Sequence, residues 1–272
     1  MSFKVACVQI NSSSVVKDNI KVIDKYIREA AEEGAEIIFT PENSCHMVSD
    51  IESKVDACPR QEDHPAVSHY IELSKELNVY IYIGSLGIKL DSGKLANRSF
   101  LFSPDGEIVN IYDKIHLFEV KLDTGETHKE SKHYEGGDRA VVAKTSLANL
   151  GMTICYDVRF PHLYRDLAKA GAEIMVVPAA FTVPTGKAHW ETLLRARAIE
   201  TGSFVIAVGQ TGEHDGGRKT YGHSMVINPW GEVVIDAGID VGIIYADIDL
   251  NEIDKTRKSL ASLQHDREYK LI

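Results

Sequence analysis

The chain has 272 residues, of which 44% are hydrophobic and 26% are charged. These fractions are near globular averages and exclude a disordered, collagenous or coiled-coil protein. The formal net charge of −10 argues against a nucleic-acid binder, which carries a basic face. The start, MSFKVACVQI, has too short an apolar run for a signal peptide or a membrane span, so we expect a cytoplasmic protein with no membrane partner.

Short apolar runs rich in Val, Ile and Tyr recur along the chain and predict strands. In chain order they are VACVQI (5–10), EIIFT (36–40), VYIYIG (79–84), SFLF (99–102), IVNIY (108–112), MTIC (152–155), IMVV (174–177), FVIAV (204–208), SMVIN (224–228), VVID (233–236) and IIYADI (243–248). Apolar steps of three and four predict helices over 16–31 and 190–201. SPDG at 103–106 and NPWG at 228–231 predict type I turns, and DSG at 91–93 predicts a further hairpin.

Helical crossovers mixed with hairpins favour one large mixed sheet, or two packed sheets with helices outside, over an alternating βα barrel. No low-complexity stretch divides the chain, so we expect a single domain over residues 1–272. The polar stretch 117–139 has no clear periodicity. Loops of that length in compact domains are often functional, so we interpret it as an active-site loop.

The four cysteines are scattered, without a CxxC pair or the spacing of a zinc site: Cys7, Cys45, Cys58 and Cys155. We expect free thiols, most of them buried. Cys155 differs because it lies between a strand-like run and a helix that Pro161 can open. Such an elbow exposes a side chain above a sheet edge, near backbone N–H groups that can bind an anion. From its position alone, a buried thiol without chemistry remains the alternative.

Two charged residues follow other strand-like runs. Glu42 stands in FTPEN after EIIF, and Lys114 stands in IYDKIHLF between apolar neighbours. In isolation, a capping or surface acid and a snorkelling surface lysine are the plain alternatives. Since Glu42, Lys114 and Cys155 each follow a separate strand, however, a mixed sheet can bring all three to one edge.

FTPEN, YDKIHLF and GMTICYDVRFP together resemble the three motifs of the nitrilase superfamily of carbon–nitrogen hydrolases. Their order matches, as do the spacings of 72 residues from Glu42 to Lys114 and 41 from Lys114 to Cys155. The resemblance extends from VACVQI to the C-terminal QHDRE. Downstream, TGKAHWETLLRARAIE, YGHSMVINPWG and ADIDL are similar to the amidase branch that contains omega-amidase and deaminated glutathione amidase.

This resemblance implies a four-layer αββα sandwich with mixed sheets, which usually dimerises, so we expect a homodimer or a higher homo-oligomer. It also implies that Cys155 is the nucleophile, Glu42 the general base, and Lys114 the cation that stabilises the tetrahedral intermediate. The family's second glutamate lies between the lysine and cysteine motifs. The ESK of KESKHYEGGD matches it best, which gives Glu130 as a fourth catalytic residue; the alternatives are Glu126 and Glu135.

The implied reaction is hydrolysis of a small ω-amide with a distal carboxylate to an acid and ammonia, through a cysteine thioester and without a cofactor or metal. Because a free thiol has a pKa of about 8.5, a neighbouring base or cation is needed to activate it. Lys114 and the Tyr156 backbone N–H are expected to stabilise the oxyanion. Deaminated glutathione is the first substrate we expect. The alternatives are omega-amidase action on α-ketoglutaramate, an N-carbamoyl amine hydrolase, and a non-catalytic interaction subunit of the same fold.

Three further residues are candidates for holding the substrate. Arg159 can clamp a carboxylate through its bidentate fork, or brace the site by pairing with Asp157 or Glu130. Lys187 replaces the proline usual in this branch, and a cation there favours an anionic amide. His189 is expected to face the pocket.

Other features of the sequence have plainer interpretations. Trp190, in AHWE, has the spacing of a core residue. Two pairs of histidines have separations that fit no metal-binding pattern, so we expect exposed or structural roles for them: His128 with His133, and His214 with His223.

Overall fold

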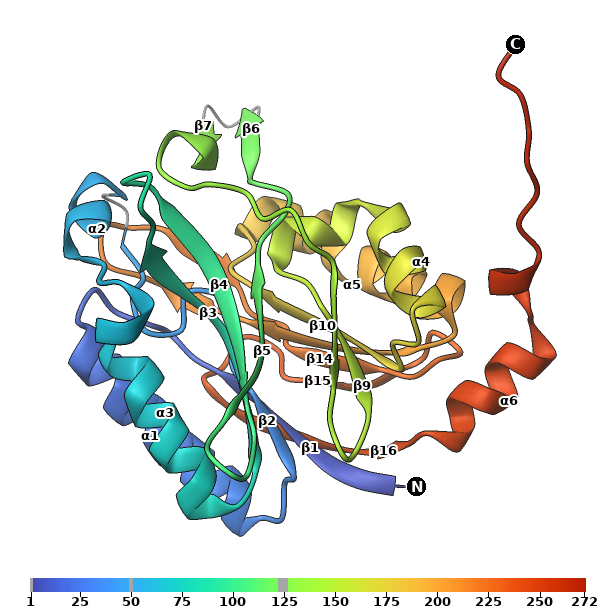
Figure 1. The fold of residues 1–272 in the computed structure, drawn as a ribbon, viewed down its shortest axis with the longest axis horizontal. Helices are drawn as coiled ribbons and strands as arrows, with labels where there is room; N and C mark the ends of the chain where they lie inside the picture. Colours follow the sequence, from blue (N-terminus) through green and yellow to red (C-terminus); the bar gives the residue numbers. More distant parts are fainter. Residues whose placement is uncertain (1, 49–50, 122–126) are drawn as a thin grey trace.

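The computed structural model describes residues 2–48, 51–121 and 127–272. Two six-stranded sheets pack face to face, and helices cover the outer face of each sheet (Figure 1). This arrangement is the αββα sandwich that the resemblance implies. The alternative of one large mixed sheet is wrong, because the apolar faces of two separate sheets bury each other.

The first sheet has the strand order β16-β1-β2-β3-β4-β5. In chain order its strands are β1 (Ser2–Gln9), β2 (Ile37–Phe39), β3 (Tyr80–Lys89), β4 (Leu95–Phe102), β5 (Ile108–Asp113) and β16 (Gly242–Asp249). β1, β2 and β3 pair in parallel, whereas β4 runs antiparallel to both β3 and β5. Since the direction reverses twice, β2 and β5 end at the same edge of the sheet.

The second sheet has the order β15-β14-β11-β10-β9-β8. Its strands are β8 (Val141–Lys144), β9 (Asn149–Met152), β10 (Ile174–Ala179), β11 (Phe204–Gly209), β14 (Met225–Ile227) and β15 (Val233–Asp236). β9, β10 and β11 are parallel, so their carboxyl ends share one edge. Two small hairpins lie outside the sheets: β6 (Glu119–Lys121) with β7 (Thr127–Lys129), and β12 (Thr211–Glu213) with β13 (Lys219–Tyr221).

Four helices form the outer layers. α1 (Val16–Glu32) and α3 (Pro65–Leu77) cover the first sheet, and α4 (Pro161–Lys169) and α5 (Val183–Thr201) cover the second (Figure 1). α2 (Ile51–Ala57) lies beyond the end of the first sheet, and α6 (Asn251–Ser259) leads to the C-terminal segment. The short 3-10 helices are η1 (Gln61–Asp63), η2 (Glu130–Lys132), η3 (Cys155–Arg159) and η4 (Ser262–Gln264).

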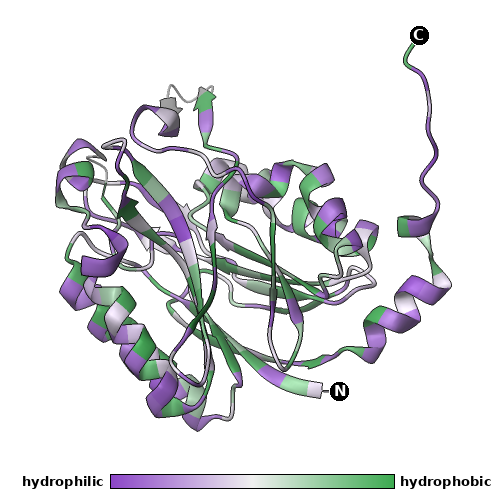
Figure 2. Cartoon of the chain, in the orientation of Figure 1, coloured by the Kyte–Doolittle hydropathy of each residue, from purple (hydrophilic) through white to green (hydrophobic). Residues whose placement is uncertain are grey.

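Strand β1 shows why the strands read as continuous apolar runs instead of alternating ones. Val5 and Cys7 pack in the core between the two sheets, whereas Ala6 and Val8 pack in the core under α1 and α3. Because both faces of the strand are covered, neither face selects polar residues. In Figure 2 the strands of the sheets are accordingly largely green, while α1 is striped green and purple.

The predicted turns are confirmed, since Gly106 N–H donates to Ser103 O and Gly231 N–H to Asn228 O, both at 2.9 Å. The 117–139 stretch, predicted as a loop, contains the short elements β6, β7 and η2, which are too short to show a period. Two predicted boundaries are wrong. The MTIC strand ends at Met152, and the helix expected over 190–201 begins earlier, at Val183, with Pro184 in its first turn.

Candidate active site

The ends of strands from both sheets surround a cavity of about 380 Å³. Four of its lining residues are those for which catalytic roles were predicted in the sequence: Glu42, Lys114, Glu130 and Cys155. Glu42 follows β2 and Lys114 follows β5, at the shared edge of the first sheet. Cys155 follows β9, at the facing edge of the second sheet.

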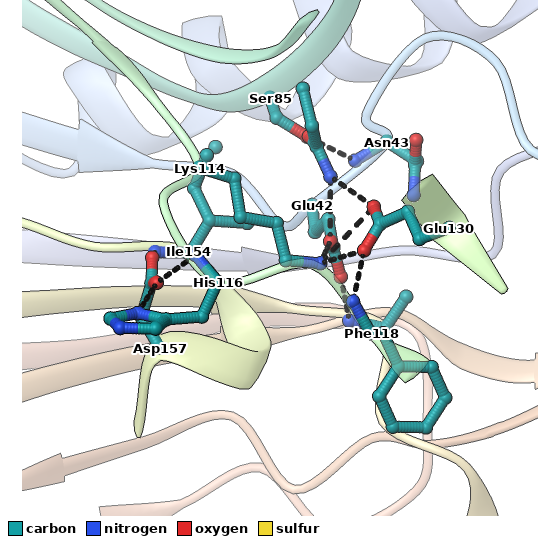
Figure 3. A network of polar contacts seen from close by, with 12 residues as sticks. Glu42, Asn43, Ser85, Lys114, His116, Phe118, Glu130, Ile154 and Asp157 are labelled. Carbon is teal, nitrogen blue, oxygen red and sulfur yellow. Dashed lines mark hydrogen bonds and ion pairs between the residues drawn. The ribbon is translucent and has the colours of Figure 1, made fainter. Parts of the chain in front are cut away.

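The Glu42 carboxylate is buried, with its side chain 4% exposed, and both of its oxygens accept hydrogen bonds. Oε1 accepts from Lys114 Nζ at 2.9 Å (Figure 3) and from Asn97 Nδ2 at 2.9 Å. Oε2 accepts from the Ala180 N–H at 2.9 Å. The Gln210 amide also donates to the Glu42 carbonyl at 3.0 Å. The carboxylate is therefore fixed from both sheets.

Gly84 permits the close approach that positions the Glu42 turn. A Cβ atom at residue 84 would lie 2.2 Å from the carbonyl oxygen of Thr40 and 2.4 Å from that of Pro41. Only glycine lets β3 run this close to the chain that leads into Glu42.

Lys114 lies between two carboxylates. Its ammonium is 2.9 Å from Glu42 Oε1 and 2.9 Å from Glu130 Oε2, and its side chain is only 2% exposed. The Lys114 backbone N–H donates to Asn97 O at 3.0 Å, and the Gly137 N–H donates to Lys114 O at 2.9 Å. Both ends of the residue are thus held, which fixes where the ammonium points.

Glu130 reaches the cavity from η2, and its side chain is 13% exposed. Besides Lys114, its Oε2 accepts from the Phe118 N–H at 2.6 Å, which ties the two ends of the β6–β7 hairpin together (Figure 3). Glu135, one of the alternatives, is exposed and does not line the cavity. Glu126, the other, lies outside the described residues.

Cys155 has a left-handed backbone, with φ at +49°, at the first residue of η3. Non-glycine residues rarely adopt this conformation, and they do so mainly where the surrounding structure enforces it. The thiol donates a hydrogen bond to Glu42, and the Ala180 N–H also faces the sulfur. All four cysteines are free, as predicted, and three of them are buried as expected. Cys155 is buried as well, instead of exposed above the sheet edge, and it is the cysteine that lines this cavity.

Asp157 connects the Cys155 turn to the Lys114 segment. It is fully buried, and its Oδ2 accepts from the Tyr112 hydroxyl at 2.7 Å and from the Ile154 N–H at 2.9 Å. Its Oδ1 lies 3.0 Å from the His116 backbone N–H and 2.7 Å from His116 Nδ1 (Figure 3). This role could not be predicted from the sequence, because Tyr112 and His116 lie over forty residues away along the chain.

Burial and charge fix the protonation states of the three central groups. Burial raises the pKa of Glu42, but the ammonium of Lys114 and the hydrogen bonds that it receives outweigh this effect, so its pKa lies below the ordinary value. Burial lowers the pKa of Lys114, yet Glu130 and Glu42 together hold it well above the usual range. Burial and the charge of Glu42 raise the pKa of the Cys155 thiol. At neutral pH the site therefore holds a carboxylate, an ammonium and a neutral thiol.

Arg159 faces the same cavity from the end of η3. Its guanidinium lies 5.5 Å from the Phe181 ring centroid and 5.8 Å from that of Tyr156. The alternative that Arg159 braces the site through Asp157 or Glu130 is wrong, because within the described chain it forms an ion pair with neither. Its guanidinium therefore lines the cavity beside two aromatic rings.

The remaining predicted contacts lie farther out. Lys187 is exposed on α5 and is not among the cavity-lining residues, because that helix turns its side chain to the surface. His189 is also exposed; its Nδ1 lies 3.3 Å from Arg159 Nη2, so it meets the cavity only through that residue. Trp190 is buried in the core, as predicted, and its Nε1–H donates to His223 O at 2.8 Å.

Four cations that the sequence did not single out also line the cavity: Lys129 and Lys132 on either side of Glu130, and Lys54 and Arg218 from more distant segments. Lys54 comes from α2 and Arg218 from the turn of the β12–β13 hairpin. Neither segment carries a motif or a periodic pattern that marks it. Of the predicted histidine pairs, His214 is structural: its two ring nitrogens lie 2.9 Å from Ser12 O and 2.7 Å from Thr220 Oγ1.

The αββα sandwich, with a thiol, a carboxylate and an ammonium in one cavity, indicates a hydrolase that has a cysteine in its site. Comparison with known proteins indicates the same class. The carbon–nitrogen hydrolase family model matches residues 4–258. The chain belongs to the carbon–nitrogen hydrolase family. No helix in the described ranges is long and apolar enough to cross a membrane.

Relatives of known name cover nearly the whole chain. A deaminated glutathione amidase of Synechocystis is 37% identical over 265 residues, covering 96% of each chain. The human omega-amidase is 35% identical over 268 residues, covering 98% of this chain and 95% of its own. Among solved structures, the NitFhit protein of C. elegans has a TM-score of 0.91 and 34% identity, covering 98% of this chain and 65% of that longer one.

Proposed function

We propose that this protein is an amidase that hydrolyses a small ω-amide bearing a distal carboxylate, with Cys155 as the nucleophile. The observation that carries the proposal is the grouping of Cys155, Glu42 and Lys114, with Glu130, around one cavity. The names of the Synechocystis and human relatives support an amide substrate. Deaminated glutathione is the first candidate.

The first step is attack of the Cys155 sulfur on the amide carbonyl carbon. As the S–C bond forms, the thiol proton passes to the Glu42 carboxylate, to which it is already hydrogen-bonded. The neutral resting thiol makes this base necessary, and the lowered pKa of Glu42 keeps the base ionised. Nucleophile and base thus form one unit.

The negative charge that develops on the carbonyl oxygen faces Lys114. Because Glu42 and Glu130 hold its ammonium in place, little reorganisation is needed when the oxyanion forms. The Tyr156 N–H is a second donor, since it lies in the first turn of η3, where backbone N–H groups lack partners within the helix.

Collapse of the intermediate breaks the C–N bond, and the departing nitrogen takes the proton from Glu42. A water molecule then attacks the Cys155 thioester, giving a proton to the same carboxylate with Glu130 nearby to orient it. The acid leaves as the C–S bond breaks, and the proton returns from Glu42 to the sulfur. Atoms and charge balance over the cycle, with the amide and water giving an acid and ammonia or an amine.

Arg159 is the proposed contact for the substrate's distal carboxylate. Its planar fork can bind both carboxylate oxygens, and the rings of Phe181 and Tyr156 limit its movement. Lys187 and His189 are left with a lesser role at the mouth of the cavity, since neither side chain lines it.

The test is a screen of purified protein for ammonia or amine release from about a dozen small amides, with Cys155→Ala as the blank. Intact-protein mass spectrometry of Glu42→Gln with a substrate should detect an acyl adduct on Cys155. For the best substrate, the free acid should exceed its methyl ester by at least about thirtyfold in kcat/KM, the worth of a buried charge contact. Release by Cys155→Ala at the wild-type rate would refute the proposal.

Omega-amidase activity is the second candidate, favoured by the similarity to the human enzyme. Turnover of α-ketoglutaramate and of deaminated glutathione under the same conditions separates the two. The larger kcat/KM identifies the activity.

A homodimer in the cytoplasm completes the proposal, because the resemblance to the family favours such an assembly. Sedimentation of the purified protein should give twice the mass of the 30.1 kDa chain. A single species with the mass of one chain at micromolar concentration would contradict it.

A further inference from the structure

Lys54 is a buried cation that faces the cavity without a carboxylate partner. Its residue is 4% exposed, and its ammonium donates to Asn43 Oδ1 at 2.7 Å and to His46 O at 2.9 Å. Both acceptors are neutral, and no ion pair joins Lys54 to any carboxylate of the described residues. A buried ammonium is normally paired with an anion, because burial alone disfavours the charged form.

Arg218 faces the same cavity in a similar condition. Its Nη2 donates to Ala180 O at 3.0 Å, but its Nε–H is buried without a hydrogen-bond partner. The residue is held in place because His214, on the same hairpin, is anchored to Ser12 and its N–H donates to Arg218 O at 2.8 Å. A fixed guanidinium with an unused buried donor is suited to an anionic group that enters the cavity.

The site's own carboxylates make no direct ion pair with these two cations. Glu42 is engaged by Lys114, Asn97 and the Ala180 N–H, and it makes no ion pair with Lys54 or Arg218 within the described residues. The charges of Glu42 and Glu130 act on Lys54 only from a distance, and burial still holds the pKa of Lys54 below its usual value. An anion that enters the cavity can therefore make the direct contacts that these two cations lack.

We propose that Lys54 and Arg218 form a second anion subsite, which binds a carboxylate on the amine half of the substrate. This inference rests on the amidase function proposed above and deepens it: deaminated glutathione, the first candidate substrate, carries a peptide on its amide nitrogen, and the subsite assigns Lys54 and Arg218 to the carboxylate of that leaving group.

The position of Ala180 assigns this subsite to the amine half. Its N–H binds Glu42 Oε2, and its carbonyl binds Arg218, so a single residue separates the proton donor from the guanidinium. Glu42 must lie beside the departing nitrogen to protonate it. A short substituent on that nitrogen then extends along Ala180 toward Arg218, while Arg159, on the Phe181 ring, binds the acyl half.

The experiment compares N-succinylglycine with N-succinylglycinamide, which differ only in the charge at the end of the amine half. Wild-type kcat/KM should favour the carboxylate by at least about thirtyfold. Arg218→Gln and Lys54→Met should each reduce that preference by at least about tenfold. Lys219→Gln, which removes an exposed cation of the same hairpin paired with Glu213, is the matched control and should keep the preference.

A binding measurement separates failure of this subsite from failure of the amidase function. In Cys155→Ala, calorimetry should give a Kd for N-succinylglycine at least about tenfold below that for the glycinamide, and adding Arg218→Gln should remove the difference. If the screen of small amides detects no turnover but this difference in Kd holds, the amidase proposal fails and the subsite stands. The subsite is overturned if the wild type has equal kcat/KM for both compounds. It is also overturned if the Lys54 and Arg218 variants lose kcat/KM equally on both compounds, which would show that these residues have purely structural roles.

Discussion

Replacing Lys114 with methionine tests whether its ammonium controls the protonation of the site. Methionine has a similar length and no charge, so the change leaves Glu42 and Glu130 in place without the cation that lies 2.9 Å from each. Both carboxylates then face each other in a buried environment.

The size of the effect follows from the burial of the pair. Lys114 is 2% exposed, and removing one partner of a buried ion pair typically costs about 3–5 kcal/mol. Loss of a fixed oxyanion donor should also lower kcat by about 10²–10³-fold. We expect both losses together, since one ammonium serves both purposes.

The pH dependence has a definite sign. In the wild type the pKa of Glu42 is lowered, so its ionisation stabilises the fold above the pKa of the unfolded chain, and this contribution is lost as pH falls. Without Lys114, burial dominates and raises that pKa, so the ionised carboxylate destabilises the fold at high pH. The difference in unfolding free energy between variant and wild type should therefore be larger near pH 8 than near pH 5.

Urea unfolding at the two pH values measures this difference. The surface variant Lys21→Met is the control, because its ion pair with Asp18 is exposed and at 3.4 Å should contribute under about 1 kcal/mol at either pH. A destabilisation by Lys114→Met that is the same at both pH values would refute the electrostatic reasoning.

Three further predictions concern the turn residues around the site. Cys155→Ala should abolish turnover and keep the circular dichroism spectrum of the wild type, because the sulfur contributes little packing at a strand end; residual activity within tenfold would count against a thioester. Gly84→Ala should lower the melting temperature and kcat together, since its Cβ would lie 2.2 Å from the Thr40 carbonyl oxygen, whereas Gly242→Ala, with open space, should change neither. Asp157→Asn should lower kcat at least tenfold with KM nearly unchanged, as the Cys155 turn loses acceptors that hold it; an unaltered kcat would exclude a positioning role.

The sequence was most informative where chemistry and local structure coincide. Glu42, Lys114 and Cys155 each follow an apolar strand, and β2 and β5 end at the same sheet edge, so a local pattern sufficed to place these residues near one another. The strands themselves were predictable because burial on both faces leaves an unbroken apolar run. The short strands β6, β7, β12 and β13 were missed because three residues do not establish a period.

Roles that depend on contacts between distant segments were beyond the reach of the sequence. Lys187 carried a plausible charge in a plausible motif, yet the helix orients it toward the surface. Arg218 and Lys54 had no motif, yet a hairpin and a short helix bring them to the cavity. A residue's charge is written in the sequence, but whether it is desolvated, and beside what, is set by its neighbours in space.

By itself, then, the amino-acid sequence predicted the strands from their apolar runs, and its short local motifs carried the family resemblance that implied the αββα sandwich and the roles of Glu42, Lys114 and Cys155. The tertiary structure alone decided that Glu130, and not Glu135, joins Glu42 beside Lys114, and that Cys155 rests as a neutral thiol. It also decided that Asp157 holds the cysteine turn. These properties arise from burial and from distances of about 3 Å between residues far apart in the chain, and no local pattern encodes such distances.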